Sequence, residues 1–384
     1  MPLRLIHITA ELPPVVGGVA DYTAILTLRL VEVSEEKIDP VLIHSGNQPA
    51  EAIDVPFPVE DLSGECSATA LAQATERLAA EGDGRAVVLL EYSGYGYASR
   101  GAPLWLARGL RRVCGEDGVP LVTMFHELYA TGPPWTSAFW MAPLQQHVAA
   151  QLAHMSAGIV TNQKSRVSWL QRHQASESIA VRMQPVFSNV GEPDRLPPFE
   201  KRARHAVVFG GGGRKSTVYD EHRNLLRRLI DQEGFSRILD IGPAEDGVLL
   251  EESWSRSLGV LSADEISDRL ASVSLGVLSY PGSRLGKSGV AAAFASHGVP
   301  FLLLNEEKSS RTTEPYVEGE HFWRGETIRK AESRLHKERL ARMSRTIRAL
   351  YENCLHSAHA ASCFHDLIQS ATATAPFAKG TSAH

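Results

Sequence analysis

Two segments in the second half of the chain place glycines next to cations, a pattern typical of phosphate binding. In the first, the apolar run 206–210 leads into a glycine cluster that ends at Gly213 and is followed by Arg214 and Lys215. Glycines leave backbone N–H donors open to a ligand, and the two cations can neutralise its charge. The segment therefore suits a diphosphate, with a flexible loop as the alternative interpretation.

The second segment, Gly286–Gly289, precedes an alanine-rich stretch that predicts a helix beginning near Ser288. Amides, a hydroxyl and the Lys287 ammonium would then meet at the positive end of that helix, where an anion is favoured. The alternative is that Ser288 only caps the helix and Lys287 is solvated. Neither segment is a P-loop, because Arg214 stands where that motif requires glycine and Pro281 takes the place of its first glycine.

The first half of the chain has a glycine pair of its own after the first apolar run. Gly17 and Gly18 follow two prolines and precede a helical stretch with Asp21 in its first turn and Tyr22 beside it. Backbone amides at such a turn can contact a phosphate or a sugar. Asp21 is a candidate base, and Tyr22 is a candidate contact to a bound substrate. An ordinary βα turn, with Asp21 favoured by the helix dipole, is the alternative.

Polar residues also end two later apolar runs of the first half. Glu91 and Tyr92 close one run, and His126 and Glu127 close another. Because ligands of open α/β sheets bind beyond the carboxyl ends of strands, we expect His126 and Glu127 in acid–base roles and Glu91 and Tyr92 in contact with a bound substrate. A structural histidine and a salt-bridged or capping glutamate are the alternatives. The aromatic stretch 128–140 fits a sugar-stacking wall or a packed loop.

The elements that carry these residues alternate between short apolar runs and helical stretches, which predicts parallel sheets flanked by helices. The runs are nearly all apolar, as buried parallel strands are. Helical spacing is clearest at 19–31 and 66–80. The fold class is therefore α/β, with two Rossmann-like, doubly wound domains facing a cleft. The expected strands are residues 3–9, 40–45, 86–93, 119–126 and 158–162 in the first series, and 205–211, 237–242, 274–280 and 299–305 in the second.

A stretch rich in proline, glycine and charged residues, 188–204, separates the two series of strands. It predicts an N-terminal domain at 1–190 and a C-terminal domain at 191–350. The remaining residues, 351–384, predict a helix that packs back on the N-terminal domain, followed by a frayed end.

Composition narrows the class of protein further. The net charge is −5 over 384 residues, with 43% hydrophobic residues, so a folded protein that does not bind nucleic acid is expected. No apolar run approaches the ~20 residues that cross a bilayer, which predicts a cytoplasmic location. Basic stretches at 106–112 and 329–348 suit a peripheral contact with anionic lipid, or simply solvated helix faces. The four cysteines lack CxxC spacing, and no metal site is expected.

The order of these motifs resembles that of the GT-B glycosyltransferases related to glycosyltransferase family 4, over most of the chain. The first loop is similar to the family's Pro-x-x-Gly-Gly pattern, and His126 matches a histidine at the end of a later strand. Residues 185–193 resemble its Pro-Asn-Gly-Val linker. Gly213–Lys215 resemble its diphosphate contact with compressed spacing, and residues 258–282 give the closest match.

This resemblance implies that the C-terminal domain binds a nucleotide-sugar donor and that the N-terminal domain binds the acceptor, the molecule that receives the sugar. Tyr22, Glu91 and Tyr92 are then the candidate contacts to the acceptor. The segment 258–282 is similar to the one that lies beside the nucleotide base, so Val260 and Leu261 are implied as base contacts. The implied donor site contains these two residues together with Gly17, Gly18, Gly213, Arg214, Lys215, Lys287, Ser288 and Gly289.

The sequence departs from the family at one important place. The family has two glutamates eight positions apart before a Gly-x-Pro, which contact the donor sugar and its ribose. Aligning Gly298–Pro300 places Leu285 and Ala293 at those positions. Because neither side chain accepts a hydrogen bond, the donor's hydroxyls must be contacted differently.

The resemblance implies a transferase that moves a sugar from a nucleotide sugar to an unknown acceptor without a metal ion. The nucleotide sugar is then a substrate and not a cofactor. The reaction would belong to polysaccharide, glycolipid or glycoconjugate synthesis. The resemblance also implies retention of the anomeric configuration, whereas Glu127 or Asp21 acting as a base would permit inversion. Two alternatives remain open. One is a different GT-B enzyme such as a nucleotide-sugar epimerase, and the other is a catalytically silent homologue that only binds a nucleotide.

Overall fold

The computed structural model divides the chain into two compact units. Unit 1 comprises Met1–Gln184 together with Ser357–His384, and unit 2 comprises Pro185–His356. The division thus falls after Gln184, and the chain returns to unit 1 at Ser357. The structure describes residues 2–15, 17–35, 37–47, 52–82, 85–115, 118–243, 253–304, 313–329 and 335–374.

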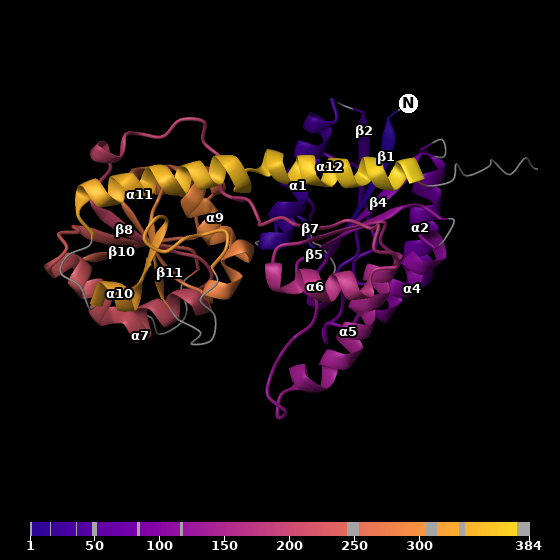
Figure 1. The fold of residues 1–384 in the computed structure, drawn as a ribbon, viewed down its shortest axis with the longest axis horizontal. Helices are drawn as coiled ribbons and strands as arrows, with labels where there is room; N and C mark the ends of the chain where they lie inside the picture. Colours follow the sequence, from indigo (N-terminus) through magenta and orange to yellow (C-terminus); the bar gives the residue numbers. More distant parts are fainter. Residues whose placement is uncertain are drawn as a thin grey trace, which may run out of the picture. The chain divides into compact units, whose positions relative to one another are not determined.

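Unit 1 is built on a seven-stranded sheet, sheet A, in the order β3-β2-β1-β4-β5-β6-β7 (Figure 1). Its strand pairs are all parallel. The order runs outward in both directions from β1 and β4, which is the doubly wound arrangement predicted from the sequence. The strands are β1 Leu3–Thr9, β2 Ile38–His44, β3 Val59–Asp61, β4 Ala86–Tyr92, β5 Leu121–Phe125, β6 Gly158–Thr161 and β7 Val181–Met183.

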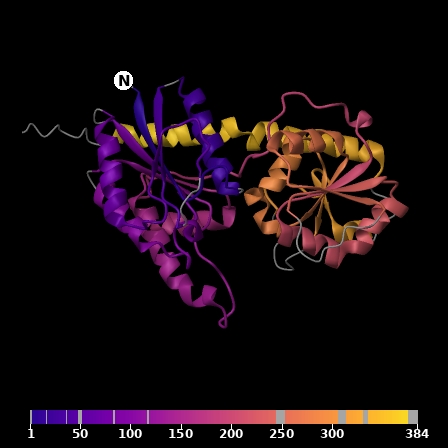
Figure 2. The same cartoon turned by 180° about the vertical axis from the view of Figure 1, so that it is seen from behind.

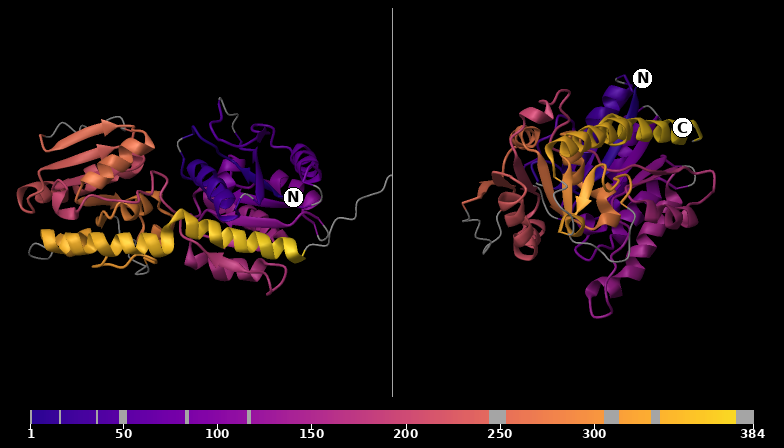
Figure 3. Two further views of the ribbon diagram at one scale, coloured as in Figure 1. Left: turned by 90° about the horizontal axis from the view of Figure 1, so that it is seen from above. Right: turned by 60° about the vertical axis from the view of Figure 1, so that its left-hand side comes forward.

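The helices of unit 1 connect these strands and bury their apolar faces against them. The core combines β-branched and leucine side chains of the strands with leucines and alanines of the helices. The helices are α1 Gly18–Val33, α2 Ala68–Ala80, α3 Gly94–Tyr97, α4 Leu104–Val113, α5 Ser137–Met155, α6 Lys164–His173 and α12 Ser357–Thr374. The last of these, α12, packs on α1 and on the face of sheet A formed by β4, β5 and β6 (Figures 1 and 3).

Unit 2 repeats the same plan with a six-stranded sheet, sheet B, in the order β10-β9-β8-β11-β12-β13 (Figure 2). Its strand pairs are parallel as well. The strands are β8 His205–Phe209, β9 Arg237–Ile241, β10 Ser255–Gly259, β11 Leu275–Ser279, β12 Phe301–Leu304 and β13 Phe322–Arg324. The main helices are α7 Gly212–Asp231, α8 Ala263–Ser272, α9 Gly289–Ser296, α10 Gly325–Arg329 and α11 Lys337–Leu350.

Short helical turns complete unit 2. They are η1 Phe199–Lys201, η2 Gly282–Lys287 and η3 Tyr351–Leu355. The linker segment after Gln184 belongs to this unit, because the Val186 amide donates to the Gly286 carbonyl at 2.9 Å. Each unit therefore has its own sheet, its own core and its own carboxyl edge.

Candidate functional site

Each sheet has one position where the strand order reverses. In sheet A it lies between β1 and β4, and in sheet B between β8 and β11. Loops diverge there at the carboxyl ends of the strands and leave room for a ligand. The predicted glycine segments follow β1 and β8, so they lie at these two positions.

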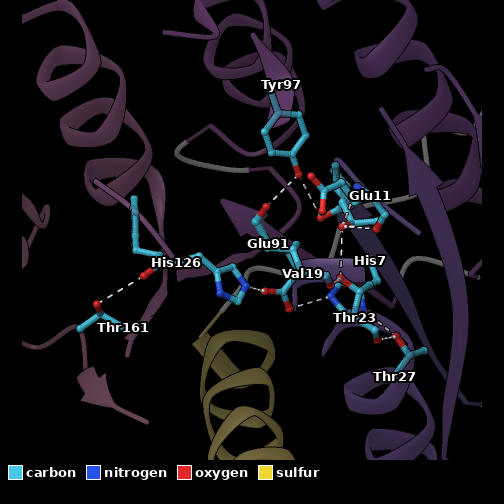
Figure 4. A network of polar contacts seen from close by, with 12 residues as sticks. His7, Glu11, Val19, Thr23, Thr27, Glu91, Tyr97, His126 and Thr161 are labelled. Atoms are coloured by element: carbon cyan, nitrogen blue, oxygen red, sulfur yellow. Dashed lines mark hydrogen bonds and ion pairs between the residues drawn. The ribbon is translucent and has the colours of Figure 1, made fainter. Parts of the chain in front are cut away.

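A buried carboxylate in unit 1 connects two histidines at this position. Glu91, at the end of β4, places one oxygen 3.0 Å from His7 Nε2 and the other 2.6 Å from His126 Nε2 (Figure 4). Glu91 and His7 are wholly buried. His7 lies in the middle of β1, and His126 directly follows β5, so three neighbouring strands supply the network.

Hydrogen bonds to α1 extend this network. The Thr27 hydroxyl donates to the Thr23 carbonyl at 2.7 Å, so it accepts from His7 Nδ1 at 2.8 Å. Burial alone would raise the pKa of Glu91, but the hydrogen bonds and charges of His126 and His7 outweigh it and lower that pKa. Glu91 is therefore a carboxylate. His7 is held between Thr27 and Glu91 through both of its ring nitrogens.

His126 remains as the group that can act on a substrate. Its Nε2 donates to Glu91, which leaves Nδ1 as an acceptor with no hydrogen bond from any described residue. The Tyr22 ring packs edge-on against the imidazole at 5.0 Å and fixes its plane. An imidazole oriented by a carboxylate in this way can accept a proton or a hydrogen bond from a hydroxyl. The predicted acid–base role of His126 is supported by this geometry and stays a prediction.

Glu91 and Tyr92 do not have the surroundings expected of acceptor contacts. Glu91 uses both carboxylate oxygens on histidines, and Tyr92 is wholly buried with its ring against Phe125. Burial, and then the charge of Glu127, raise the pKa of Tyr92. Tyr22 is also buried and packs on His126. All three side chains make their contacts inside unit 1, and Glu91 and Tyr22 position His126. Their contacts do not support a direct role in binding the acceptor.

The loop between β1 and α1 ends at Gly17 and Gly18, and their predicted ligand contact stays a prediction. Gly17 is the N-cap of α1, and no side chain caps the helix there. A Cβ at Gly17 would lie 2.7 Å from the Glu11 carboxylate, whereas one at Gly18 would meet nothing within 4 Å. Asp21 lies in the first turn of the helix. Glu11 was not singled out from the sequence, although it follows β1 directly, and its carboxylate has no hydrogen bond from another described residue.

The corresponding loop of unit 2 joins β8 to α7 through glycines. Gly210 has a φ of 140°, which favours glycine, and Gly211 begins the helix without a side-chain cap. Gly213 and Arg214 lie exposed in the first turn. The Arg214 guanidinium stacks over the ring of Tyr280, 4.5 Å from its centroid. Because Tyr280 directly follows β11, this contact holds a cation across the reversal point of sheet B.

Lys215 differs from the prediction. It is only 4% exposed, and its Nζ contacts Asp240 Oδ1 at 2.7 Å and the Gly242 carbonyl at 3.0 Å. The Tyr219 hydroxyl donates to the other oxygen of Asp240 at 2.9 Å. The ammonium is thus balanced inside unit 2, where it ties α7 to the end of β9. Its contacts support a positioning role rather than a direct diphosphate contact.

The second predicted phosphate segment begins a helix as expected. Ser288 is the N-cap of α9, and its hydroxyl accepts from the Ala291 amide at 3.2 Å. Lys287, at the end of η2, is half-buried, and a Cβ on Gly289 would lie 3.4 Å from the Asn189 amide oxygen. Asn189 was not predicted as a site residue, although its segment resembles the family's Asn-containing linker. The capping interpretation of Ser288 is confirmed, and anion binding here stays a prediction.

The positions of the missing glutamates are apolar and buried. Leu285 lies in η2 and Ala293 in the middle of α9, and both are buried. The residues implied as contacts to the nucleotide base, Val260 and Leu261, follow β10, and Val260 is 67% exposed.

Within the described ranges no cluster of three metal-ligating side chains occurs, and none of the helices has the length and hydropathy needed to span a bilayer.

Comparisons with known proteins bear on the fold. A scan against family models gives no match, and a search of curated proteins gives none either. Solved structures match over nearly the whole chain. The lipopolysaccharide outer core galactosyltransferase WaaB, in its apo form, has a TM-score of 0.55 at 14% identity, covering 96% of this chain and 99% of that one.

Two further structures match to a similar extent. The one named "Trehalose-6-phosphate from E. coli bound with UDP-2-fluoro glucose" has a TM-score of 0.60 at 11% identity, covering 95% of this chain and 99% of that one. A protein from Listeria monocytogenes assigned as a UDP-N-acetylglucosamine 2-epimerase has a TM-score of 0.52 at 14% identity, covering 99% and 93%. The chain has the GT-B fold. At these identities the likeness extends to the fold alone.

Proposed function

We propose that this chain transfers a sugar from a nucleoside diphosphate sugar to an acceptor. Unit 2 holds the nucleotide in this proposal, and unit 1 supplies His126 for a sugar or acceptor hydroxyl. The observation that carries it is the Arg214–Tyr280 contact at the reversal point of sheet B. It occurs in a GT-B fold, and one structure with that fold is bound to UDP-2-fluoro glucose.

The chemistry follows from where charge develops during transfer. When the bond between the anomeric carbon and the diphosphate breaks, negative charge accumulates on the diphosphate. In this proposal Arg214, Lys287 and the uncapped amides of α7 stabilise that charge. Cations of the protein then fill the electrostatic role that a metal ion has elsewhere, so we expect transfer to proceed without added metal.

His126 contributes on the side of the sugar and acceptor. Its Nδ1 can accept a hydrogen bond from a hydroxyl, while Glu91 and His7 keep the ring in one orientation and one tautomer. The resemblance to family 4 supports retention of the anomeric configuration as part of this proposal. A nuclear magnetic resonance spectrum of the product decides it, and an inverted product would indicate a carboxylate base such as Glu127 or Asp21.

Nucleotide binding is the first test. We expect a UDP, GDP or ADP sugar to raise the melting temperature of the wild-type protein. Arg214→Ala should weaken the affinity by about tenfold or more, because a charge-assisted contact to a phosphate is lost. Arg223→Ala is the matched control, since it removes the same charge further along α7. No shift with any nucleotide sugar, or equal losses in both variants, would contradict the proposal.

An epimerase is the second candidate, favoured by the histidine–carboxylate network of unit 1 and by the Listeria structure. Product analysis separates the two functions. A transferase releases nucleoside diphosphate in proportion to sugar transferred to an acceptor, whereas an epimerase converts the sugar without consuming an acceptor. Binding without either reaction would instead indicate a catalytically silent homologue.

A further inference from the structure

The N-terminal end of α5 exposes an unusual set of aromatic side chains. We call residues 131–144 the α5 tip; none of them is buried. Trp135 is 85% and Trp140 72% exposed, and Phe139 and Leu144 are exposed beside them. Figure 1 shows this end of α5 projecting away from the other helices of unit 1. The Phe139 and Trp140 rings contact each other, with centroids 5.4 Å apart. Exposed apolar side chains gathered at one end of a helix indicate an interaction site.

The α5 tip is held in place at its base rather than by a core of its own. Gln145, the first buried residue after it, accepts from the Ala130 amide at 2.6 Å and donates to the Arg100 carbonyl at 2.9 Å. At its start, the Thr136 hydroxyl caps the helix by accepting from the Phe139 amide at 3.4 Å. The aromatic groups are thus presented by a preformed helix, which reduces the entropy lost on binding.

The two helices that pack on α5 carry no acidic side chain. Helices α4, α5 and α6 contain no aspartate or glutamate, although the whole chain has a net charge of −5. Both α4 and α6 pack directly on α5. We call the exposed cations of these helices the basic layer; they are Arg108, Arg111, Arg112, Lys164 and Arg172. Arg166 is not one of them, because its guanidinium donates to the His126 carbonyl at 2.7 Å.

We propose that unit 1 docks on an anionic lipid surface, with the aromatic side chains of the α5 tip entering the membrane interface and the basic layer facing the lipid phosphates. Tryptophan favours the boundary between headgroups and acyl chains, because its ring is apolar and its N–H is polar. Arginines and lysines near that boundary are attracted by anionic lipid. The combination of inserted aromatics and surrounding cations gives peripheral binding.

Charge distinguishes lipid from the other occupants of this surface. In a symmetric dimer the same patch meets itself, so two basic layers would face each other and repel. A neutral sugar chain would stack on tryptophans but would not account for three adjacent helices without an acidic residue. The proposal does not depend on the transferase function, because it involves neither His126 nor Arg214.

Flotation of the full chain with vesicles tests the proposal. We expect the wild-type protein to float with vesicles of phosphatidylcholine and phosphatidylglycerol, and not with phosphatidylcholine alone. Raising the salt concentration should weaken binding, because it screens the basic layer. If the wild-type protein does not bind the anionic vesicles, the proposal is wrong.

Two variants separate the two parts of the surface. Trp135→Ser/Phe139→Ser/Trp140→Ser should weaken partitioning by about tenfold or more, because three aromatic side chains no longer leave water. Arg108→Gln/Arg111→Gln should weaken it by roughly 30-fold at low salt. Leu28→Ser/Val317→Ser, which changes exposed apolar residues elsewhere, should bind like the wild type.

Melting temperature and gel filtration complete the test. All of these substitutions lie at exposed positions, so we expect unchanged melting temperatures and unchanged elution. An aromatic variant that still floats like the wild type would overturn the proposal. A wild-type dimer that becomes monomeric in the aromatic variant, without vesicle binding, would assign the surface to a second copy of the chain instead.

Discussion

At the scale of single residues, one carboxylate determines what the edge of sheet A can do. Glu91 is wholly buried, and each of its oxygens accepts a hydrogen bond from a different histidine. A buried carboxylate is costly unless it is paired and hydrogen-bonded, and the two histidines supply its hydrogen bonds. His7 uses both ring nitrogens inside unit 1, whereas no described residue makes a hydrogen bond to His126 Nδ1. Positioning and chemistry are therefore divided between two histidines.

Replacing this carboxylate tests the division. In Glu91→Gln only one amide atom can accept, so one histidine loses its acceptor, and we expect a loss of about 3–5 kcal/mol in the free energy of unfolding. Urea denaturation at pH 7 measures the loss. Glu32→Gln, at an exposed carboxylate paired with Arg29, is the control and should change stability by less than about 0.5 kcal/mol.

The pH dependence gives this prediction a second readout. Because the pKa of Glu91 is lower in the folded than in the unfolded state, its stabilising contribution is complete above the unfolded pKa and is lost as pH falls through the folded pKa. We expect the wild type to lose this increment on acidification and the glutamine variant to lack it. Parallel stability profiles for the two proteins, followed from neutral pH to well below the pKa of an unfolded glutamate of about 4.3, would contradict the assignment.

At the scale of elements, the central strands could be predicted from the sequence and the edge strands could not. Central strands are buried on both faces and appear as apolar runs, as in Leu3–Thr9, whose predicted bounds match the structure. The strands that were missed, β3, β7, β10 and β13, are the outer strands of the two sheets. An outer strand pairs on one side only, so short polar sequences such as "VED" and "SRSLG" suffice there.

The sequence predicted the strand ends at which the candidate site residues lie, but it predicted the partners of their side chains less well. Order along the chain and strand ends located Gly17, His126 and Arg214 at the carboxyl edges. Which partner each side chain has depends on neighbours far apart in sequence, such as His7 and Glu91, 84 residues apart. A polar residue inside an apolar strand was the available signal for His7, because a buried polar group needs a partner.

Lys215 provides a test of how α7 is tied to sheet B. We expect Lys215→Met to lower the free energy of unfolding by about 3–5 kcal/mol, because Asp240 keeps a buried charge without its cation. The double variant Lys215→Met/Asp240→Asn should recover part of that loss, since the pair is removed together. Chemical denaturation measures both. If Lys215→Met instead keeps full stability and loses only nucleotide affinity, the lysine contacts the diphosphate after all.

At the scale of the whole molecule, unit 1 is completed by the last helix of the chain. The chain leaves unit 1 after Gln184, forms unit 2, and returns at Ser357. Helix α12 then packs on α1 and on β4, β5 and β6, the strands that lead to Glu91 and His126. The side of the sheet that carries the histidine network thus depends on a segment that follows unit 2 in sequence.

This connection predicts that a single change in α12 loosens unit 1 and leaves unit 2 unaffected. Phe364 is wholly buried in α12, so Phe364→Ala should cost about 3–5 kcal/mol of the stability of unit 1. Hydrogen exchange read by mass spectrometry should show lost protection in β1, β4 and α1, with β8 and β11 unchanged, because each unit has its own core. The exposed Gln369→Ala on the same helix is the control. Equal loss of protection in both units would show that they unfold together, and no loss in unit 1 would show that α12 does not support it.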